Sequence, residues 1–238
     1  MALFKSALVT QLSGSIGGMT AAHNSSGMYL RARTIPVNPN SNRQQAMRMY
    51  MDSAVTFWTQ TLTEAQRESW RTYAQNVTLM NPLGDPINVS GQNMFVRSGV
   101  AMLLVGNPLD QIEEAPTIFN TGDPGTLSID TADSALNTVT INIDGAPAWA
   151  AIDEASILGF MAPPQNPSVN FLKGPFRFVN DVRGNSVTPL TSADFDTTDA
   201  DPPIPFIEGQ RVFFRVRVLY DDGRLTQAFI FHVEAADV

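Results

Sequence analysis

Residues 35–77 read IPVNPNSNRQQAMRMYMDSAVTFWTQTLTEAQRESWRTYAQNV and contain the clearest helical pattern in the chain. Pro36 and Pro39 disfavour helix before about residue 40, because proline fixes φ and restricts the residue before it. Beyond that point, one helix face is marked at the i, i+3, i+4, i+7 spacing by Ala46, Met49, Tyr50, Ser53, Ala54, Phe57 and Trp58. A helix with so wide an apolar arc is expected to contact protein on more than one side. The arc is widened by Met47, Met51 and Val55.

A second helix is predicted to follow directly. Thr63 as N-cap and Gln66 three residues later match a capping box, and Leu62 occupies the staple position. Trp58 and Trp70 can approach each other across this turn. We interpret the aromatic stripe as a helix–helix core, and a ligand-stacking role is the alternative.

The same stretch carries a resemblance. It resembles a pattern of tailed-phage and prophage structural proteins. That pattern consists of a Gly-rich strand pair, an Asn-Pro, a Gln-rich helix start, a Trp and a Leu-Thr-x-x-Gln-Arg-x-x-Trp turn. The matching positions are Arg31, Arg33, Pro36, Asn38, Pro39, Gln44, Gln45, Arg48, Trp58, Leu62, Thr63, Gln66, Arg67 and Trp70. The segment NPSVNFLKGPFRFV, Asn166–Val179, is similar to a part of such proteins. The resemblance covers about a third of the chain and implies a virion component without catalytic residues.

Composition narrows the class of protein. The 238 residues suffice for one large domain or two small ones, and 43% apolar residues is ordinary for a globular protein. No cysteine is present, so neither a disulfide framework nor a thiolate metal site is expected. Met1–Ala22 lacks the unbroken apolar core of a secretion signal, and no stretch approaches 18 apolar residues. We therefore expect no membrane contact.

Charge is distributed unevenly. Residues 1–100 carry eight Lys or Arg and four Asp or Glu, whereas residues 101–238 carry seven and nineteen. The acidic half argues against direct nucleic-acid contact, because phosphate binding needs a basic surface. The asymmetry permits head-to-tail contact between the basic end of one copy and the acidic body of the next. The alternative is that both charged surfaces are only solvated. The densest basic group comprises Arg31, Arg33, Arg43 and Arg48, for which pairing with an acidic neighbour is favoured over contact with packaged DNA.

The N-terminal residues predict a β-hairpin arm. Gly17–His23 and Met28–Thr34 flank Asn24–Gly27, a plausible four-residue loop. Arg31 and Arg33 are expected on one strand face, with Leu30 and Ala32 on the other. An isolated hairpin is marginal in water, so pairing with another chain or packing on the helices is expected. The sequence Ser13–Gly18 is Gly-rich, but it lacks the Lys-Ser/Thr ending of a phosphate-binding loop.

After a loop over residues 78–90, Ser90 is the predicted N-cap of a third helix, Gly91 to about Val105. From Pro108 onward the pattern has period two, which is typical of strands. Strands are predicted at Thr126–Thr131, Thr138–Ile143, Ala155–Met161, Phe176–Val179, Arg211–Tyr220 and Leu225–Glu234. Such spacing favours an antiparallel β-sandwich of the fibronectin or immunoglobulin type.

Candidate chemistry is sparse. Asp194, Asp196, Asp199 and Asp201 lie in an expected loop over residues 191–205 and could attract Ca²⁺, although a solvated acidic loop is the simpler interpretation. His23 and His232 lack the surroundings of a catalytic triad or a zinc site. Asp153 and Glu154 could contribute to a carboxylate pair, which the sequence alone cannot assign. We therefore expect no enzyme, no cofactor, no metal and no small-molecule substrate.

We predict an α+β chain with a β-hairpin arm at residues 1–35, a three-helix unit at 36–107 and a β-sandwich at 108–238. The expected function is structural, in a bacteriophage virion, at the tail, head–tail connector or capsid surface. The expected partners are other copies of the chain and other virion proteins. The assembly interface is predicted at Arg31, Arg33, Arg43, Arg48, Trp58 and Trp70. The alternative is a host-recognition module that binds glycan or protein through sandwich loops, with Phe171 and Phe195 as the only loop aromatics.

Overall fold

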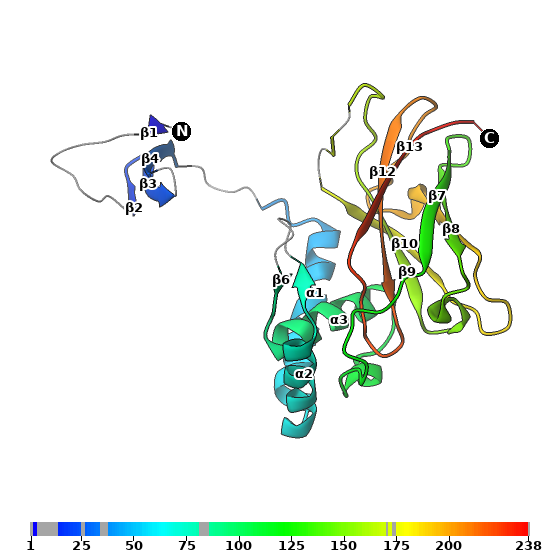
Figure 1. The fold of residues 1–238 in the computed structure, drawn as a ribbon. Coiled ribbons are helices and arrows are strands. Elements are labelled where there is room, and N and C mark those ends of the chain that lie inside the picture. The colour runs from blue at the N-terminus through cyan, green and yellow to red at the C-terminus, as the bar shows by residue number, and fades with distance from the viewer. Residues whose placement is uncertain are drawn as a thin grey trace. The chain divides into compact units, whose positions relative to one another are not determined.

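The computed structural model describes residues 2–3, 14–24, 27–33, 38–80, 86–169, 171–172 and 175–237. Contacts divide the chain into a first unit, Met1–Ser41, and a second unit, Asn42–Val238, called the body below. The α+β class is confirmed, since the helices are followed by antiparallel sheets (Figure 1). The predicted boundary between residues 107 and 108 falls inside the body.

The first unit is a small antiparallel sheet with the strand order β1-β4-β3-β2. Its strands are β1 Ala2–Leu3, β2 Gly14–Ile16, β3 Met19–Asn24 and β4 Gly27–Ala32. The β3–β4 hairpin was predicted, but its pairing extends to Asn24 and Gly27. The connection is therefore shorter than the expected four-residue loop, and its residues 25 and 26 lie outside the described ranges.

The body begins with α1, Asn42–Thr56, which continues into a π-helical segment, Phe57–Thr61. Helix α2, Glu64–Asn76, begins at the predicted capping box: Thr63 Oγ1 accepts from the Gln66 amide, and the Gln66 side chain accepts from the Thr63 amide. A short pair of strands, β5 Leu79–Met80 and β6 Pro86–Ile87, separates α2 from α3. Helix α3, Gly91–Leu104, starts at the predicted N-cap Ser90, whose Oγ accepts from the Asn93 amide. A 3₁₀ turn, Leu109–Ile112, then leads to the sheets.

Two antiparallel sheets follow, with the orders β11-β8-β7 and β10-β9-β12-β13. Their strands are β7 Thr126–Asp133, β8 Thr138–Asp144, β9 Ser156–Met161, β10 Arg177–Arg183, β11 Ser192–Asp196, β12 Arg211–Leu219 and β13 Phe229–Glu234. Alternate residues face inward, as on β12, where Val212, Phe214, Val216 and Val218 are fully buried. They join Ile141, Trp149 and Phe195 in one core between the sheets.

The strand order excludes one of the expected sandwich arrangements. Counted from β7, the fourth strand is β10, and it pairs with the third strand, β9. In a constant-type immunoglobulin domain the fourth strand instead joins the sheet of the first, second and fifth. The order therefore differs from that of a constant-type immunoglobulin domain.

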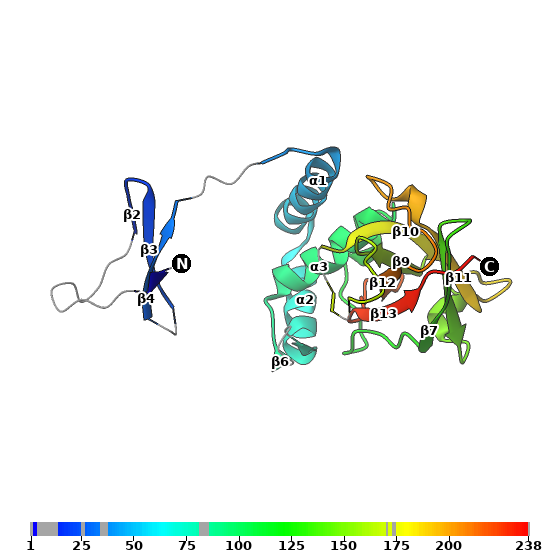
Figure 2. The same ribbon diagram turned by 90° about the horizontal axis from the view of Figure 1, so that it is seen from above.

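Helix α3 packs against part of the outer face of the four-stranded sheet, and α1 and α2 pack on α3 (Figures 1 and 2). Trp70, Phe95 and Met102 share a second core with Leu158 of β9 and Leu219 of β12. The predicted helical unit is therefore not independent of the sandwich, because one side of its core is the sheet itself. Arg183 of β10 adds a polar link by donating to the Val105 carbonyl at the end of α3, at 2.8 Å.

The expected acidic loop over residues 191–205 contains a strand, β11, and a 3₁₀ turn, Thr197–Asp199. Ala193 and Phe195 are buried between the sheets, while Asp194 points outward. The sequence Ser-Ala-Asp-Phe-Asp alternates with period two, and the aspartates occupy the solvent side of that strand. Phe195 was expected as an exposed loop aromatic, and this prediction is wrong because its ring packs on Phe214, with centroids 5.1 Å apart.

Candidate assembly surfaces

The N-terminal sheet has two chemically different faces. Ser15, Thr20 and Arg31 are in register across three strands, and the Ser15 and Thr20 hydroxyls are 3.0 Å apart. Ile16 and Met19 are paired on the opposite face and are 74% and 49% exposed. Among the described side chains of this unit only Ala21 is buried. The sheet therefore carries an exposed apolar face, and its described side chains form almost no core.

The boundary between the two units is also a boundary of charge. Residues 1–41 contain three Lys or Arg and no Asp or Glu, so their formal charge is +3. Residues 42–238 contain twelve Lys or Arg and twenty-three Asp or Glu, so their formal charge is −11. The predicted asymmetry is thus sharper than a division at residue 100 indicates.

The four predicted arginines are divided between the two units. Arg31 and Arg33 are exposed at β4 in the first unit, whereas Arg43 and Arg48 belong to α1 in the body. Arg48 is exposed, but Arg43 is half-buried and donates to the carbonyls of Phe178, at 2.9 Å, and Asp201, at 3.4 Å. Arg43 therefore links α1 to the sandwich.

A pocket of about 320 Å³ surrounds Arg43, with walls from α1, β10 and the segment containing Asp199 and Asp201. Burial lowers the pKa of the Arg43 guanidinium, and the nearby Asp201 carboxylate acts in the opposite direction. Met47 and Tyr50 supply the apolar part of the lining. The pocket can accept a small mixed polar and apolar group, but its arginine already has backbone partners.

The two predicted tryptophans lie inside the body. Trp70 is fully buried, and its Nε1 donates to the Ile112 carbonyl at 3.2 Å. Trp58 is 7% exposed. Both rings pack on Phe95 of α3, with centroid distances of 5.6 Å for Trp58 and 5.4 Å for Trp70. Phe95, an apolar residue of the predicted third helix, therefore lies at the centre of the helical core and contacts both tryptophans.

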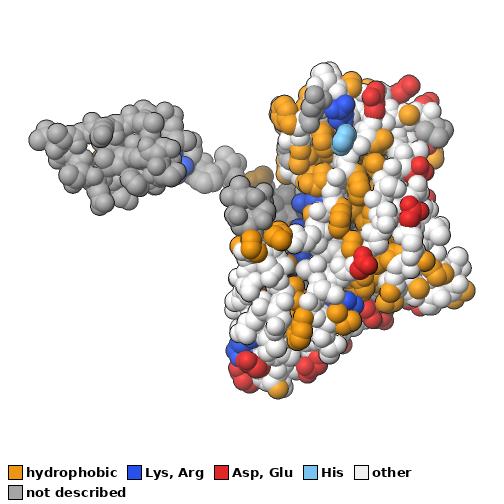
Figure 3. Space-filling view, in the orientation of Figure 1, with side chains coloured by type: hydrophobic (Ala, Val, Ile, Leu, Met, Phe, Trp, Pro, Cys, Tyr) orange, Lys and Arg blue, Asp and Glu red, His pale blue; other side chains and the backbone are white. Residues whose placement is uncertain are grey.

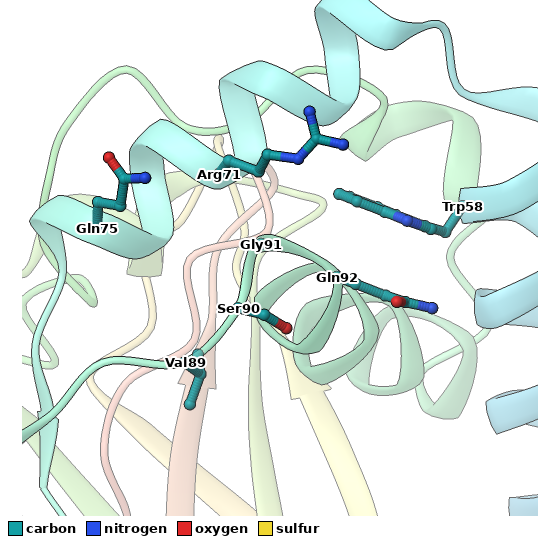
Figure 4. Close-up of a pocket in the computed structure, with 7 residues that line it drawn as sticks. All are labelled: Trp58, Arg71, Gln75, Val89, Ser90, Gly91 and Gln92. Carbon is teal, nitrogen blue, oxygen red and sulfur yellow. The ribbon is translucent and has the colours of Figure 1, made fainter.

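Trp58 also forms one wall of a second pocket, of about 410 Å³ (Figure 4). Arg71 and Gln75 project from α2, and Gln92 lies beside the Trp58 ring at the start of α3. The start of α3 sits directly on α2, because a Cβ added to Gly91 would lie 2.8 Å from the Arg71 Cα. The pocket is thus shaped by close contact between two helix backbones.

The charged group of this second pocket is already paired. Arg71 donates to Glu64 at 2.6 Å and to Glu68 at 2.8 Å, and the hydrogen bond from Arg71 lowers the pKa of Glu64. The Ser90 hydroxyl serves as the cap of α3. We therefore assign this pocket a structural role in the helical core.

No group of three or more His, Cys, Asp or Glu side chains that could hold a metal occurs in the part of the chain that the structure describes. Asp194 accepts from the Thr140 hydroxyl at 2.7 Å, and Asp196 accepts from the Thr198 amide at 2.8 Å. These acids of the calcium candidate therefore have structural partners. The phosphate candidate at Ser13–Gly18 begins outside the described residues.

The other titratable candidates have ordinary surroundings. The Asp153 carboxylate accepts from the Ser186 amide and hydroxyl, at 2.7 Å and 2.9 Å, and these bonds lower the pKa of Asp153. His232 is exposed on β13, and its ring lies 5.9 Å from the Phe213 ring. The side chain of His23 lies outside the described residues.

Comparisons with family models, with curated proteins and with solved structures find no match to this chain. Among the described helices, none is both long enough and apolar enough to traverse a bilayer.

Proposed function

We propose that this chain is a structural component of a bacteriophage virion, at the tail, head–tail connector or capsid surface, and that it acts by binding other subunits. The observation that carries the proposal is the N-terminal sheet, which presents Ile16 and Met19 on one face and, among its described side chains, buries only Ala21. Burying an exposed Ile or Met side chain contributes about 1.5–3 kcal/mol. A sheet of this kind gains its stability by binding another surface.

Charge supports the same proposal. The first unit is basic and contains no acid, whereas the body is acidic, so the two kinds of unit attract each other between neighbouring copies. The resemblance of Arg31–Trp70 to phage structural proteins supports a virion as the setting of such contacts. Arg31 and Arg33 are the groups of the predicted interface that remain exposed on the basic unit.

The alternative, recognition of a host glycan or protein by sandwich loops, has weaker support. Of its two loop aromatics, Phe195 is buried in the core and Phe171 alone is exposed. Glycan-binding surfaces usually use exposed aromatic rings, so one ring is a small basis for that function.

The solution mass of the full chain, measured by light scattering, tests the assembly proposal. We expect a mass that is a multiple of the 25.9 kDa monomer, with fewer subunits in the double variant Ile16→Asp/Met19→Asp. Val187→Asp is the matched control, because Val187 is an 89% exposed side chain of the body. An unchanged mass in the double variant, or a monomeric wild type, would contradict the proposal.

The virion part of the proposal has its own test. Peptide mass spectrometry of purified phage particles should detect this chain at a stoichiometry of several copies per particle. Its presence only in the host lysate, and never in the particles, would contradict a virion role.

A further inference from the structure

The two sheets of the sandwich end in four edge strands, and three of these are protected against pairing. β10 carries Arg177, Asp181 and Arg183, and its register shifts between Phe178 and Asp181. The register of β7 shifts between Ile129 and Thr131, and β11 has only five residues, two of which are aspartates. Charges, bulges and short length are the features by which natural sheets prevent edge-to-edge association.

The fourth edge strand, β13, has no register shift and carries a single charged residue, Glu234. It pairs with β12 in a continuous register from Arg211↔Glu234 to Val216↔Phe229. Its sequence, Phe-Ile-Phe-His-Val-Glu, contains no Lys, Pro or Gly, and its single acid lies opposite Arg211. In a body with a formal charge of −11, β13 is thus a regular and nearly neutral edge.

The backbone of β13 offers hydrogen bonds on its outer side. The Ala235 amide donates to the Gln210 carbonyl of the neighbouring chain segment at 2.8 Å. Backbone groups alternate in direction along a strand, so those of Ile230, His232 and Glu234 point away from β12. Between Phe229 and Glu234 no described strand pairs with that side of β13, whereas two residues further on Ala236 pairs with Asp133 of β7.

The sandwich core is incompletely covered at the same edge. Val212, Phe214 and Val216 of β12 are fully buried, but their partners on β13 are not. Phe229 is 37% exposed, and Phe231 and Val233 are only partly buried. Figure 3 shows hydrophobic side chains gathered on the face where β13 lies. A further strand beside β13 would cover this part of the core.

We propose that β13 pairs antiparallel with β13 of a second copy, so that two four-stranded sheets become one sheet of eight. This inference rests on the proposed function, namely that the chain acts by binding other subunits, and it names the surface and the partner. Main-chain hydrogen bonds supply affinity in such strand addition, and the alternating side chains supply specificity.

Side-chain alternation and charge define the register. Inward residues must face inward residues, because a shift by one residue would turn every side chain to the other face. A two-fold axis at Phe231 satisfies this condition and places Phe231 beside its copy and Ile230 beside His232 of the second copy. Glu234 then lies opposite Ala228 of the second copy, so the two carboxylates stay apart.

A cross-linking experiment tests this register in the full chain, which has no cysteine of its own. Phe231→Cys places two thiols directly opposite each other at the axis, within the Cα separation that a disulfide needs. We expect a covalent dimer after mild oxidation. Phe229→Cys is the matched control, since its two copies are offset by four residues, about 13 Å along the strand, and cannot form a disulfide. Equal cross-linking of both variants, or of neither, would overturn the proposal.

A second measurement separates this proposal from the proposed function. In the Ile16→Asp/Met19→Asp background we expect a mass of twice 25.9 kDa, and addition of Ile230→Lys should reduce it to 25.9 kDa. Ile230 is 53% exposed, so lysine there blocks pairing without disturbing the core, and circular dichroism verifies the fold. Val187→Lys is the control and should leave the dimer intact. If the N-terminal variants reduce the mass but Ile230→Lys does not, the β13 proposal fails and the assembly function stands. If neither alters the mass, both fail.

Discussion

The Trp70 ring meets the Phe95 ring edge to face, with centroids 5.4 Å apart and planes inclined by 84°. Neither side chain is exposed to solvent. This contact joins α2 to α3 at the centre of the helical core, and the outer face of the sheet completes that core.

We expect Trp70→Ala to lower the free energy of unfolding by about 3–5 kcal/mol, because it creates a cavity in a closed core and removes a donor to the Ile112 carbonyl. Trp58→Ala should cost less, about 2 kcal/mol, because the Trp58 ring lines an open pocket. Urea unfolding followed by circular dichroism measures both. Equal losses would contradict the distinction between a closed core and a pocket wall.

The capping box at the start of α2 gives a second prediction. Thr63→Ala removes the acceptor for the Gln66 amide and should lower the free energy of unfolding by about 0.5–2 kcal/mol. Thr72→Ala, an exposed position within the same helix, is the control and should be neutral or slightly stabilising. The two variants are compared by urea unfolding, and a loss at Thr72 as large as that at Thr63 would argue against a capping effect.

Gly159 of β9 tests the packing of the sandwich core. A Cβ at this position would lie within 3 Å of the Phe195 and Phe214 rings, which are fixed by the surrounding core. Gly159→Ala should therefore cost about 1–3 kcal/mol in thermal or urea unfolding.

Gly99 of α3 provides the comparison, because the nearest atom to its added Cβ is a methyl group of Leu109, at 3.1 Å. A shift of that methyl group and the gain in helix propensity should make Gly99→Ala close to neutral. If Gly99→Ala is the more damaging of the two substitutions, the description of a rigid ring pair at Gly159 is wrong.

Tyr73 gives a prediction for alkaline pH. Burial raises the pKa of Tyr73 from its ordinary value of 10.0 to about 12, and its hydroxyl donates to the Asn120 carbonyl at 2.6 Å. The folded protein retains this proton at a pH where the unfolded chain loses it. The contribution of Tyr73 to stability is therefore complete below pH 10 and falls by about 3 kcal/mol as the pH rises to 12.

Ultraviolet titration of the tyrosines provides the measurement. Tyr73→Phe should remove a step near pH 12, and the stability difference between wild type and variant should decline between pH 10 and 12. A Tyr73→Phe titration that retains the late step would assign that step to another tyrosine.

Local signals in the sequence predicted most of the secondary structure. The structure confirms three such signals: the Thr63 capping box, the Ser90 cap and the alternation along β12. Each depends only on residues that are neighbours in the sequence. β11 escaped prediction because Ala193 and Phe195 alternate with acidic residues that resemble a loop. Its identity as a strand depends on pairing with β8, which is more than fifty residues away in the sequence.

The candidate surfaces depended still more on tertiary structure. Arg31 and Arg43 are close in sequence, but the boundary between the two units separates them. The role of Phe95 comes from two rings that reach it from different helices. The open edge of β13 can be recognised only when the strand order and the three protected edges are known, since its residues resemble those of any buried strand.

The protection of three edges limits how far the sheets of the body can grow. In the proposed dimer, each β13 pairs with its own copy about a two-fold axis, so neither β13 remains available to a third body. The irregular edge strand β10 then lies at both ends of the joined sheet. Addition therefore stops at two bodies, whereas an unprotected β10 would permit an endless ribbon. In the proposed dimer, the irregularity between Phe178 and Asp181 thus separates a closed pair of bodies from a fibril.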